Sequence, residues 1–273
     1  MKTIERDNVR FDYTITGKGV TTLLFVHGAF INKDYWNEQV EYFSPDYQVV
    51  TIDLAGHGKS GKDRNDWSIQ AMGDDVITLI KELNLSNIIL IGHSFGGDVI
   101  LEVACKVPYL ITGFVGVDNF KNAGAEMPGE IQKQIDQVIS YLKNDFSNAS
   151  EIYVRRALIT SSTDSLISNR IIKDYRNFDP VAGVSIITSS FSYFSREREL
   201  LKRLTFKLYL INVDYFPTNE DLLKKYAHSG FGISLIQGSC HYPMIEKPVE
   251  FNRLLRDIII KIENKSGLNK PKI

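Results

Sequence analysis

Short apolar runs alternate with amphipathic segments along most of the chain. The runs are rich in β-branched residues and predict buried strands at 21–26, 47–52, 88–92, 111–117, 206–212 and 232–237. The segments between them repeat apolar residues at helical spacing and predict helices at 35–43, 68–83, 98–106, 219–228 and 248–262. Because strands that alternate with helices form parallel crossovers, we expect an α/β fold with a mostly parallel, doubly wound sheet flanked by helices. Residues 2–16 read as two further strands at an antiparallel edge.

The middle of the chain departs from this alternation. From about residue 119 to 200 there is no clear buried strand, and helical, aromatic-rich segments occur at 129–146, 150–160, 165–175 and 184–194. This stretch is too long for a connection inside a compact core, so it predicts an insertion. The domain boundaries that follow are 1–118 and 196–263 for a core domain, 119–195 for the insertion, and 264–273 for a short, basic, flexible tail.

Composition narrows the class of protein. The 273 residues carry a formal net charge of −1, which gives no general attraction to nucleic acid or to anionic membranes. Two cysteines, Cys105 and Cys240, do not make a disulfide framework. The first residues do not resemble a signal peptide, and no apolar run approaches the roughly 20 residues needed to span a bilayer. We therefore expect a cytoplasmic protein with no nucleic-acid partner and no membrane span.

The sequence Gly92-His93-Ser94-Phe95-Gly96 follows the apolar run at 88–92 and precedes a predicted helix. Strand, sharp turn and helix form the context in which G-x-S-x-G acts as a nucleophile elbow. The turn presents the serine hydroxyl at the carboxyl end of the sheet, beside the free N–H groups of a helix N-terminus. Other chemistry-bearing residues also fall at or just after predicted strand ends, where ligand sites of such sheets lie. These residues are His27, Asp53, Asp118, Asp214 and His241.

Four segments in this order resemble the α/β-hydrolase fold family: HGAF at 27–30, DLAGHGKS at 53–60, GHSFGG at 92–97 and CHYPMIEKP at 240–248. The resemblance runs from about residue 10 to residue 262, apart from the insertion. It implies a serine nucleophile, a late histidine base, an acid between them, and a helical cap inserted after the strand that ends at Asp118. A serine nucleophile, in place of an aspartate, argues against the haloalkane dehalogenase and epoxide hydrolase branches.

Serine chemistry requires a base within hydrogen-bond reach and a carboxylate that orients the base. His241 is the predicted base, because it follows the last strand in a loop before the final helix. His27 and His93 are interpreted as structural residues beside the site, and His57 and His228 as surface or loop residues. Asp53 is interpreted as a structural loop aspartate.

Two residues compete for the role of the acid. Asp214 follows the strand at 206–212, the family's usual location, although the loop Val213-Asp214-Tyr215-Phe216-Pro217 is shortened. Asp118 follows the preceding strand, where some members carry the acid and many carry a structural aspartate. The alternatives are nearly even, with a slight preference for Asp214.

The resemblance also implies an oxyanion hole formed by the backbone N–H groups of Phe95 and Ala29. Phe30 and Phe95 either line an acyl pocket or belong to the core. The insertion carries many aromatic residues that either roof an apolar pocket or pack against the main domain: Tyr141, Phe146, Tyr153, Tyr175, Phe178, Phe191, Tyr193 and Phe194. No cluster has metal-ligand spacing and no cofactor is implied.

These residues together predict a carboxylesterase-like serine hydrolase that cleaves small to medium, mostly apolar esters through an acyl-enzyme on Ser94. The same triad would serve a C–C hydrolase, an amidase, a thioesterase or a cofactor-free perhydrolase. A second alternative is a ligand-sensing protein that keeps the triad and turns over little substrate.

Overall fold

The computed structural model describes residues 2–126 and 128–267 and contains one eight-stranded sheet with the order β1-β2-β4-β3-β5-β6-β7-β8. β1 and β2 pair antiparallel at one edge, β2 pairs antiparallel with β4, and the remaining neighbours are parallel. This arrangement confirms the predicted mostly parallel sheet. The strands are β1 Lys2–Arg6, β2 Val9–Thr16, β3 Thr22–Val26, β4 Gln48–Ile52, β5 Ile88–His93, β6 Ile111–Val117, β7 Leu208–Val213 and β8 Phe231–Ile236.

The central strands are apolar because both faces of the sheet are covered. β3 and β5 are buried at every position, as expected for parallel strands with helices on both sides. In the register of the sheet, Val26 pairs with Gly92, and His93 pairs with Val117. The chain therefore leaves β3, β5 and β6 at nearly the same level, which brings the segments after these strands to one edge.

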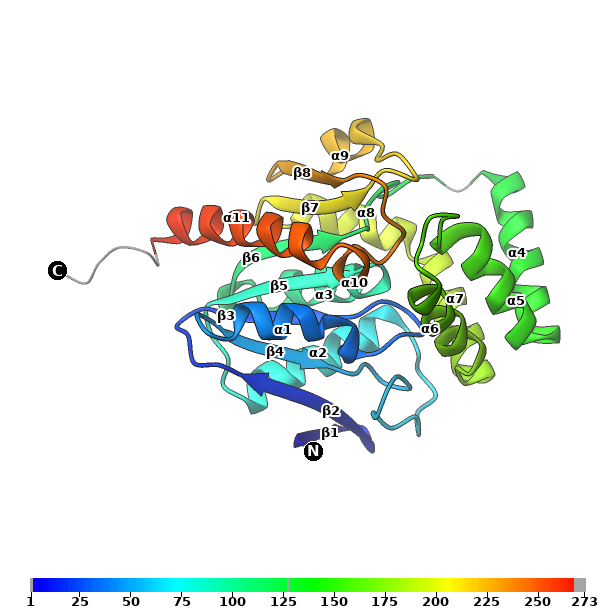
Figure 1. The fold of residues 1–273 in the computed structure, drawn as a ribbon, viewed down its shortest axis with the longest axis horizontal. Coiled ribbons are helices and arrows are strands. Elements are labelled where there is room, and N and C mark those ends of the chain that lie inside the picture. The colour runs from blue at the N-terminus through cyan, green and yellow to red at the C-terminus, as the bar shows by residue number, and fades with distance from the viewer. Residues whose placement is uncertain (1, 127, 268–273) are drawn as a thin grey trace.

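Helices cover both faces (Figure 1). α1 and α11 pack together on one face with α10 at the end of α11, while α2, α3 and α8 lie on the other face and α9 packs against α8. Their bounds are α1 Asn37–Phe43, α2 Ile69–Glu82, α3 Phe95–Lys106, α8 Phe194–Arg203, α9 Glu220–Tyr226, α10 Pro243–Glu246 and α11 Pro248–Ser266. Two short 3₁₀ segments, η1 Lys33–Trp36 and η2 Pro108–Leu110, precede α1 and β6.

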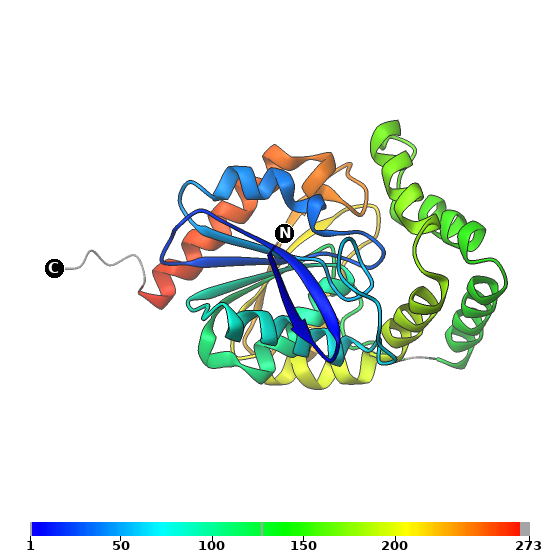
Figure 2. The ribbon, with the colours of Figure 1, turned by 90° about the horizontal axis from the view of Figure 1, so that it is seen from below.

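The insertion forms a separate layer of helices beyond the carboxyl ends of the strands, seen on the right in Figures 1 and 2. We call α4 to α7 with η3 the cap. Its elements are α4 Gly129–Asn144, α5 Phe146–Tyr153, the π-helical turn η3 Val154–Leu158, α6 Ser165–Arg176 and α7 Pro180–Ser192. α7 also contacts α2, so the cap touches the main domain away from the loop that introduces it.

Three sequence expectations need correction. α3 begins at Phe95, directly after the serine, and not at residue 98. α8 was not predicted; it packs on α3 and continues the main domain from residue 194. α11 continues to Ser266, so residues 264–266 are helical and do not belong to a flexible tail. Gly267 is the C-cap residue of α11, and residues 268–273 of the expected tail lie outside the described residues.

Candidate active site

Ser94 lies at the sharp turn between β5 and α3. Its backbone has φ 49° and ψ −125°, a conformation that residues other than glycine rarely adopt. Residues with such strained backbones cluster at functional sites. The turn is tight: a Cβ on Gly92 would approach the carbonyl oxygen of Gly96 to 2.5 Å, and one on Gly96 would approach the carbonyl oxygen of Val26 to 2.5 Å. Only glycine fits these two positions, which explains the motif. The side-chain amide of Asn119 donates to the carbonyl of Ser94 at 2.8 Å and fixes the turn from the next strand end.

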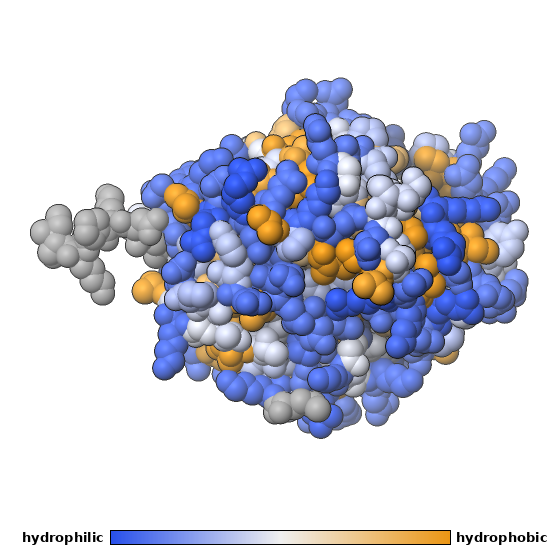
Figure 3. All heavy atoms as spheres, viewed as in Figure 1, coloured by the Kyte–Doolittle hydropathy of each residue, from blue (hydrophilic) through white to orange (hydrophobic). Residues whose placement is uncertain are grey.

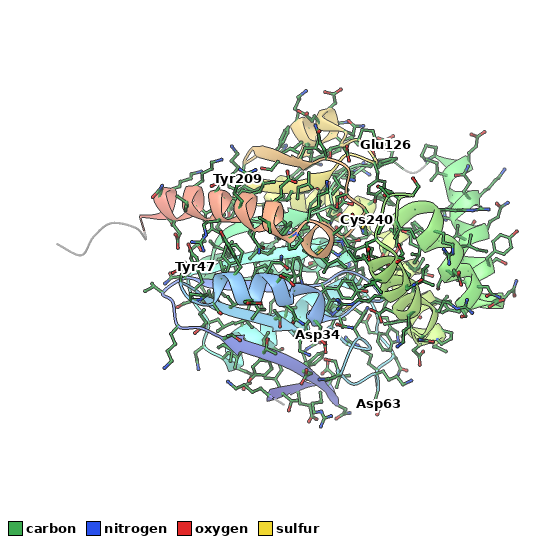
Figure 4. All side chains as sticks on the ribbon, in the orientation of Figure 1. Asp34, Tyr47, Asp63, Glu126, Tyr209 and Cys240 are labelled. Atoms are coloured by element: carbon green, nitrogen blue, oxygen red, sulfur yellow. The ribbon has the colours of Figure 1, made fainter. Side chains whose placement is uncertain are left out.

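His241 and Asp118 meet at the same edge of the sheet. His241 Nδ1 lies 2.5 Å from Asp118 Oδ2, and the backbone N–H of His241 donates to the carbonyl of Leu158 in the cap. With Nδ1 donating to the carboxylate, Nε2 is left as the acceptor nitrogen of the neutral ring. His241 and Ser94 line one cavity. His241 follows Cys240, which Figure 4 labels in the loop after β8, on the side of the main domain that faces the cap.

The carboxylate of Asp118 is surrounded by donors. Oδ1 accepts from the backbone N–H of Val213 at 3.1 Å and pairs with Lys121 Nζ at 2.6 Å. Oδ2 accepts from His241 and from the hydroxyl of Tyr215 at 3.3 Å, and that hydroxyl is also 3.3 Å from His241 Nδ1. Burial alone would raise the pKa of Asp118, but the hydrogen bond and charge of His241, together with Lys121, outweigh it and hold this pKa below its ordinary value.

Asp214 has a different position. It lies one residue past β7, is exposed, and accepts a hydrogen bond from the backbone N–H of Gly238 at 2.9 Å. The structure brings Asp118 to the imidazole and leaves Asp214 on the turn after β8, which corrects the slight preference for Asp214. The physical reason lies in the shortened loop after β7, which turns away from the site directly after the strand. As a result Tyr215, the residue after Asp214, contacts the imidazole of His241, and Asp214 does not.

The remaining histidines serve the scaffold. His93 Nε2 lies 2.8 Å from the carbonyl oxygen of His241, and the two imidazole rings pack with their centroids 4.6 Å apart. His27 Nε2 accepts from the N–H of Leu54 at 3.0 Å, and burial lowers the pKa of His27 to about 4. His57 lies in the loop after β4, as one of the two expected alternatives had it, but it is buried and not at the surface. Its ring packs near Phe178 of the cap, and burial lowers its pKa to about 3. His228 is exposed, as expected.

Asp53 lies in a buried ion pair away from the imidazole. Its carboxylate accepts from the backbone N–H and the ammonium of Lys33 at 2.8 and 2.9 Å, and from the backbone N–H of Lys59 at 2.9 Å. Lys33 also pairs with Asp12. These contacts tie the loops after β3 and β4 together.

Ala29 and Phe95, the expected sources of oxyanion donors, both line the cavity that contains Ser94 and His241. Phe95 is the first residue of α3, where backbone N–H groups have no partner inside the helix. Phe30 does not line this inner cavity. It is buried, has φ 63°, packs against Phe146, Tyr175 and Phe178, and lines a second cavity within the cap.

The inner cavity has a volume of about 220 Å³ and a mixed wall. Cap and α8 residues such as Tyr153, Ile187, Phe191 and Phe194 supply its apolar side. Two carboxyl groups, Asp98 of α3 and Glu197 of α8, also line it. Burial raises the pKa of Glu197 to about 7, and burial together with the nearby Glu197 raises the pKa of Asp98 well above its ordinary value. Each of these two carboxyl groups therefore keeps its proton more readily than an exposed carboxyl group does.

Sequence reasoning missed four residues of this site: Lys121, Tyr215, Asp98 and Glu197. Lys121 follows Asp118 by three residues, and Asp98 follows Ser94 by four, so both were within local reach of a predicted site residue. Tyr215 directly follows Asp214, the other candidate acid, so it too was within local reach, whereas no local spacing indicates Glu197. Within the described residues no group of three or more metal-ligating side chains comes together, and none of the helices there is long and apolar enough to cross a membrane.

Comparison with known proteins gives one family match. Residues 21–198 match the model of the alpha/beta hydrolase fold family. A hydrolase of Acinetobacter baylyi that acts on (E)-2-((N-methylformamido)methylene)succinate is 35% identical over 111 residues, which cover 40% of this chain and 42% of that protein. The matches span 29–42% of the length of bacterial relatives that include proteins of Haemophilus influenzae and Mycobacterium tuberculosis.

Other likenesses extend over nearly the whole chain. Karrikin insensitive 2 receptor IA of Petunia hybrida is 23% identical over 256 residues, covering 89% of this chain and 92% of the receptor. A thermophilic esterase of Thermogutta terrifontis has a solved structure with a TM-score of 0.79 and 19% identity, covering 95% of this chain and 97% of the esterase. An N-acyl homoserine lactone degrading enzyme, Est816, has a TM-score of 0.78 and 22% identity, covering 94% of this chain and 99% of its own. These two structures share the fold.

Proposed function

The chain belongs to the α/β-hydrolase fold family, and on that premise we propose that it is a serine hydrolase that cleaves small to medium, mostly apolar carboxylic esters through an acyl-enzyme on Ser94. The observation that carries the proposal is the 2.5 Å contact between Asp118 and His241 at the wall of a cavity that Ser94 also lines. Structural and curated relatives described as esterases or hydrolases support the class of reaction.

In the proposed reaction, Ser94 Oγ attacks the ester carbonyl while His241 Nε2 takes the hydroxyl proton. A tetrahedral intermediate forms, and its oxyanion is stabilised by the N–H groups of Ala29 and Phe95. The intermediate collapses as the imidazolium gives its proton to the departing alkoxide, which leaves as an alcohol. A water molecule then repeats these steps against the acyl-enzyme: His241 takes a proton from the water, and Ser94 leaves with the proton restored.

Asp118 orients the imidazole in this mechanism and stabilises the imidazolium that forms. The contacts of Asp118 with Val213, Lys121 and Tyr215 keep the carboxylate ionised and fixed. The inner cavity of about 220 Å³ suits a short acyl or alcohol group next to the scissile bond, and the cap forms its roof.

Pre-steady-state kinetics with p-nitrophenyl butyrate test the proposal. We expect a burst of p-nitrophenol close to one equivalent per enzyme where deacylation is slower than acylation, followed by repeated turnover. Ser94→Ala should abolish both phases while circular dichroism and the thermal midpoint stay close to wild type. Turnover that survives in Ser94→Ala would refute the assignment of the nucleophile.

A ligand-sensing role is the second candidate, because the match to the karrikin receptor spans 89% of this chain. A sensor would release about one equivalent of product and then stay acylated, whereas an enzyme would continue to turn over. The same burst experiment, followed for an hour with excess ester, separates the two.

A further inference from the structure

The cap contains a second cavity that is larger than the one at Ser94. Its volume is about 650 Å³ against about 220 Å³, and it lies among α4, α5, η3 and α7. Tyr153, Ile187 and Phe191 line both cavities. The cap cavity and the proposed catalytic pocket are therefore neighbours that share a wall formed by these three side chains.

Most of the wall of the cap cavity is apolar. Val138, Tyr141 and Ile152 line it and are exposed, with 69% of the Tyr141 surface open to solvent. Apolar residues also interrupt the otherwise largely hydrophilic surface in Figure 3. Apolar side chains that are exposed around a concavity are typical of binding sites for apolar groups. Such side chains do not stabilise the core, because they face water.

Two charged residues, Asp145 and Arg156, line the cap cavity. Of these two side chains, only that of Asp145 has a hydrogen-bond partner among the described residues. The carboxylate of Asp145 accepts hydrogen bonds from the backbone N–H and the side-chain amide of Asn148, at the start of α5. Arg156 is exposed and pairs with no carboxylate among the residues that the structure describes, so its guanidinium is accessible to a ligand. Its neighbour Arg155 pairs with Glu151 at 2.8 Å, and Arg176 pairs with the same glutamate.

The turn that carries Arg156 borders both cavities. Arg156 lies in the π-helical turn η3, whose last residue, Leu158, lines the inner cavity and accepts a hydrogen bond from the N–H of His241. Single π-helical turns in otherwise α-helical segments recur at functional sites. The same turn therefore contributes a wall of the catalytic pocket and an arginine to the cap cavity.

We propose that the cap cavity binds the distal part of the substrate, and that Arg156 binds a carboxylate at the end of that part of the substrate. The inference rests on the proposed function: the scissile ester lies at Ser94, an apolar chain passes Tyr153, Ile187 and Phe191, and the chain ends in an anion. The substrate class is then an ester with a medium-length apolar chain and a terminal carboxylate, such as a half-ester of an aliphatic dicarboxylic acid. Arginine suits this role because its planar guanidinium binds carboxylates with two parallel hydrogen bonds.

Two substrate series test the proposal on the full chain. In the acyl series, mono-p-nitrophenyl esters of dicarboxylic acids with 4 to 12 carbons are compared with p-nitrophenyl esters of fatty acids of equal length. In the alcohol series, acetate esters of ω-hydroxy acids are compared with acetates of plain alcohols of equal length. The rate of acid release is measured with a pH-stat. The series that shows the carboxylate preference identifies which half of the substrate enters the cap.

We expect wild type to prefer the carboxylate-bearing member at one range of lengths in one series. Arg156→Met should lower kcat/KM for that substrate about 10-fold or more and change the neutral ester less than about 3-fold. Arg156→Lys should keep part of the preference, and raising the salt concentration should weaken it. Arg155→Met is the matched control, because Arg155 adjoins Arg156 but pairs with Glu151; it should leave both substrates unchanged.

Several outcomes would overturn the inference: wild type without a carboxylate preference at any length in either series, Arg156→Met with equal effects on charged and neutral esters, or Arg155→Met with the same effect as Arg156→Met. Each of these leaves the proposed function intact as long as the neutral esters are cleaved and Ser94 is acylated. Failure of the proposed function has a different signature, in which no ester of either series is cleaved and Ser94 is not acylated.

Discussion

The loops after β6 and β7 both place an aspartate just beyond a buried parallel strand, yet the two carboxylates have opposite surroundings. Asp118 is 4% exposed and receives hydrogen bonds or charge from His241, Lys121, Tyr215 and Val213. Asp214 is exposed and accepts one hydrogen bond, from the turn at Gly238. The loop after β7 contributes a tyrosine hydroxyl to the imidazole in place of a carboxylate.

Position after a strand therefore does not decide which carboxylate contacts the imidazole of His241. What decides is whether the loop can bury the carboxylate and supply donors to both of its oxygens. The strained backbone of Asp118, with φ 44°, is tolerated because these contacts over-determine its position. Substitutions in both loops test whether Asp118 and Asp214 differ in this way.

The largest effect is expected from Asp118→Asn. An amide cannot stabilise the imidazolium and favours the wrong tautomer of His241, so kcat for p-nitrophenyl butyrate should fall about 10³- to 10⁴-fold. Asp214→Asn is the matched control and should change kcat less than about 3-fold. A large loss in Asp214→Asn with a small one in Asp118→Asn would reverse the comparison, and equal mild losses would mean that neither aspartate orients the base.

Removal of the charge on Lys121 should have an intermediate effect. Lys121→Met leaves Asp118 Oδ1 without its ion-pair partner, so kcat/KM should fall about 10-fold and the free energy of unfolding at pH 7 by about 1–3 kcal/mol. Lys121→Arg keeps the charge and should retain most of both. An unchanged free energy of unfolding in Lys121→Met, measured by urea denaturation, would show that the ion pair does not hold the carboxylate.

The stability loss in Lys121→Met should depend on pH in one direction. Because the pKa of Asp118 is lowered in the folded state, its contribution to stability is present above the unfolded pKa of about 3.9 and is lost as pH falls through the folded pKa. The difference in unfolding free energy between wild type and Lys121→Met should therefore be full at pH 6–7 and shrink toward pH 3. A difference that grows on acidification would contradict the stated role of Lys121.

The smallest effect is expected from Tyr215→Phe. The hydroxyl of Tyr215 lies 3.3 Å from both Asp118 Oδ2 and His241 Nδ1, long distances for hydrogen bonds, so kcat should fall only about 2- to 5-fold. Tyr209→Phe is a suitable control, because Tyr209 lies on β7 away from Cys240, the residue that precedes His241 (Figure 4). A loss approaching that of Asp118→Asn would mean that the loop after β7 supplies a main partner of the base after all.

Much of the fold could be predicted because its signals are local. Buried parallel strands have uninterrupted apolar sequences, and the glycines around Ser94 are required by contacts within a few residues of the turn. The order of strand, serine and helix therefore indicated the elbow correctly. The cap helices were also visible in the sequence, although α7 begins four residues earlier than expected and α8 was missed.

The rest of the site depends on long-range packing that no spacing reveals. Asp118 and Asp214 both follow strand ends, and only the path of the loop after β7 separates them. His57 is a loop residue, as its sequence context indicates, but it is buried, with the ring of Phe178 of the cap 4.6 Å away. Glu197 of α8 lines the same cavity as Ser94, roughly a hundred residues after it in the sequence. Such residues become visible only when the cap and the main domain are placed together.

Labelling with an alkyl fluorophosphonate tests the central claim most directly, because the reagent traps an activated serine irrespective of the natural substrate. Intact mass followed by peptide mapping should show one adduct per chain, on Ser94, at a rate that falls steeply in Asp118→Asn and stays close to wild type in Asp214→Asn. Absence of an adduct on Ser94, or an adduct that persists in Ser94→Ala, would contradict the account.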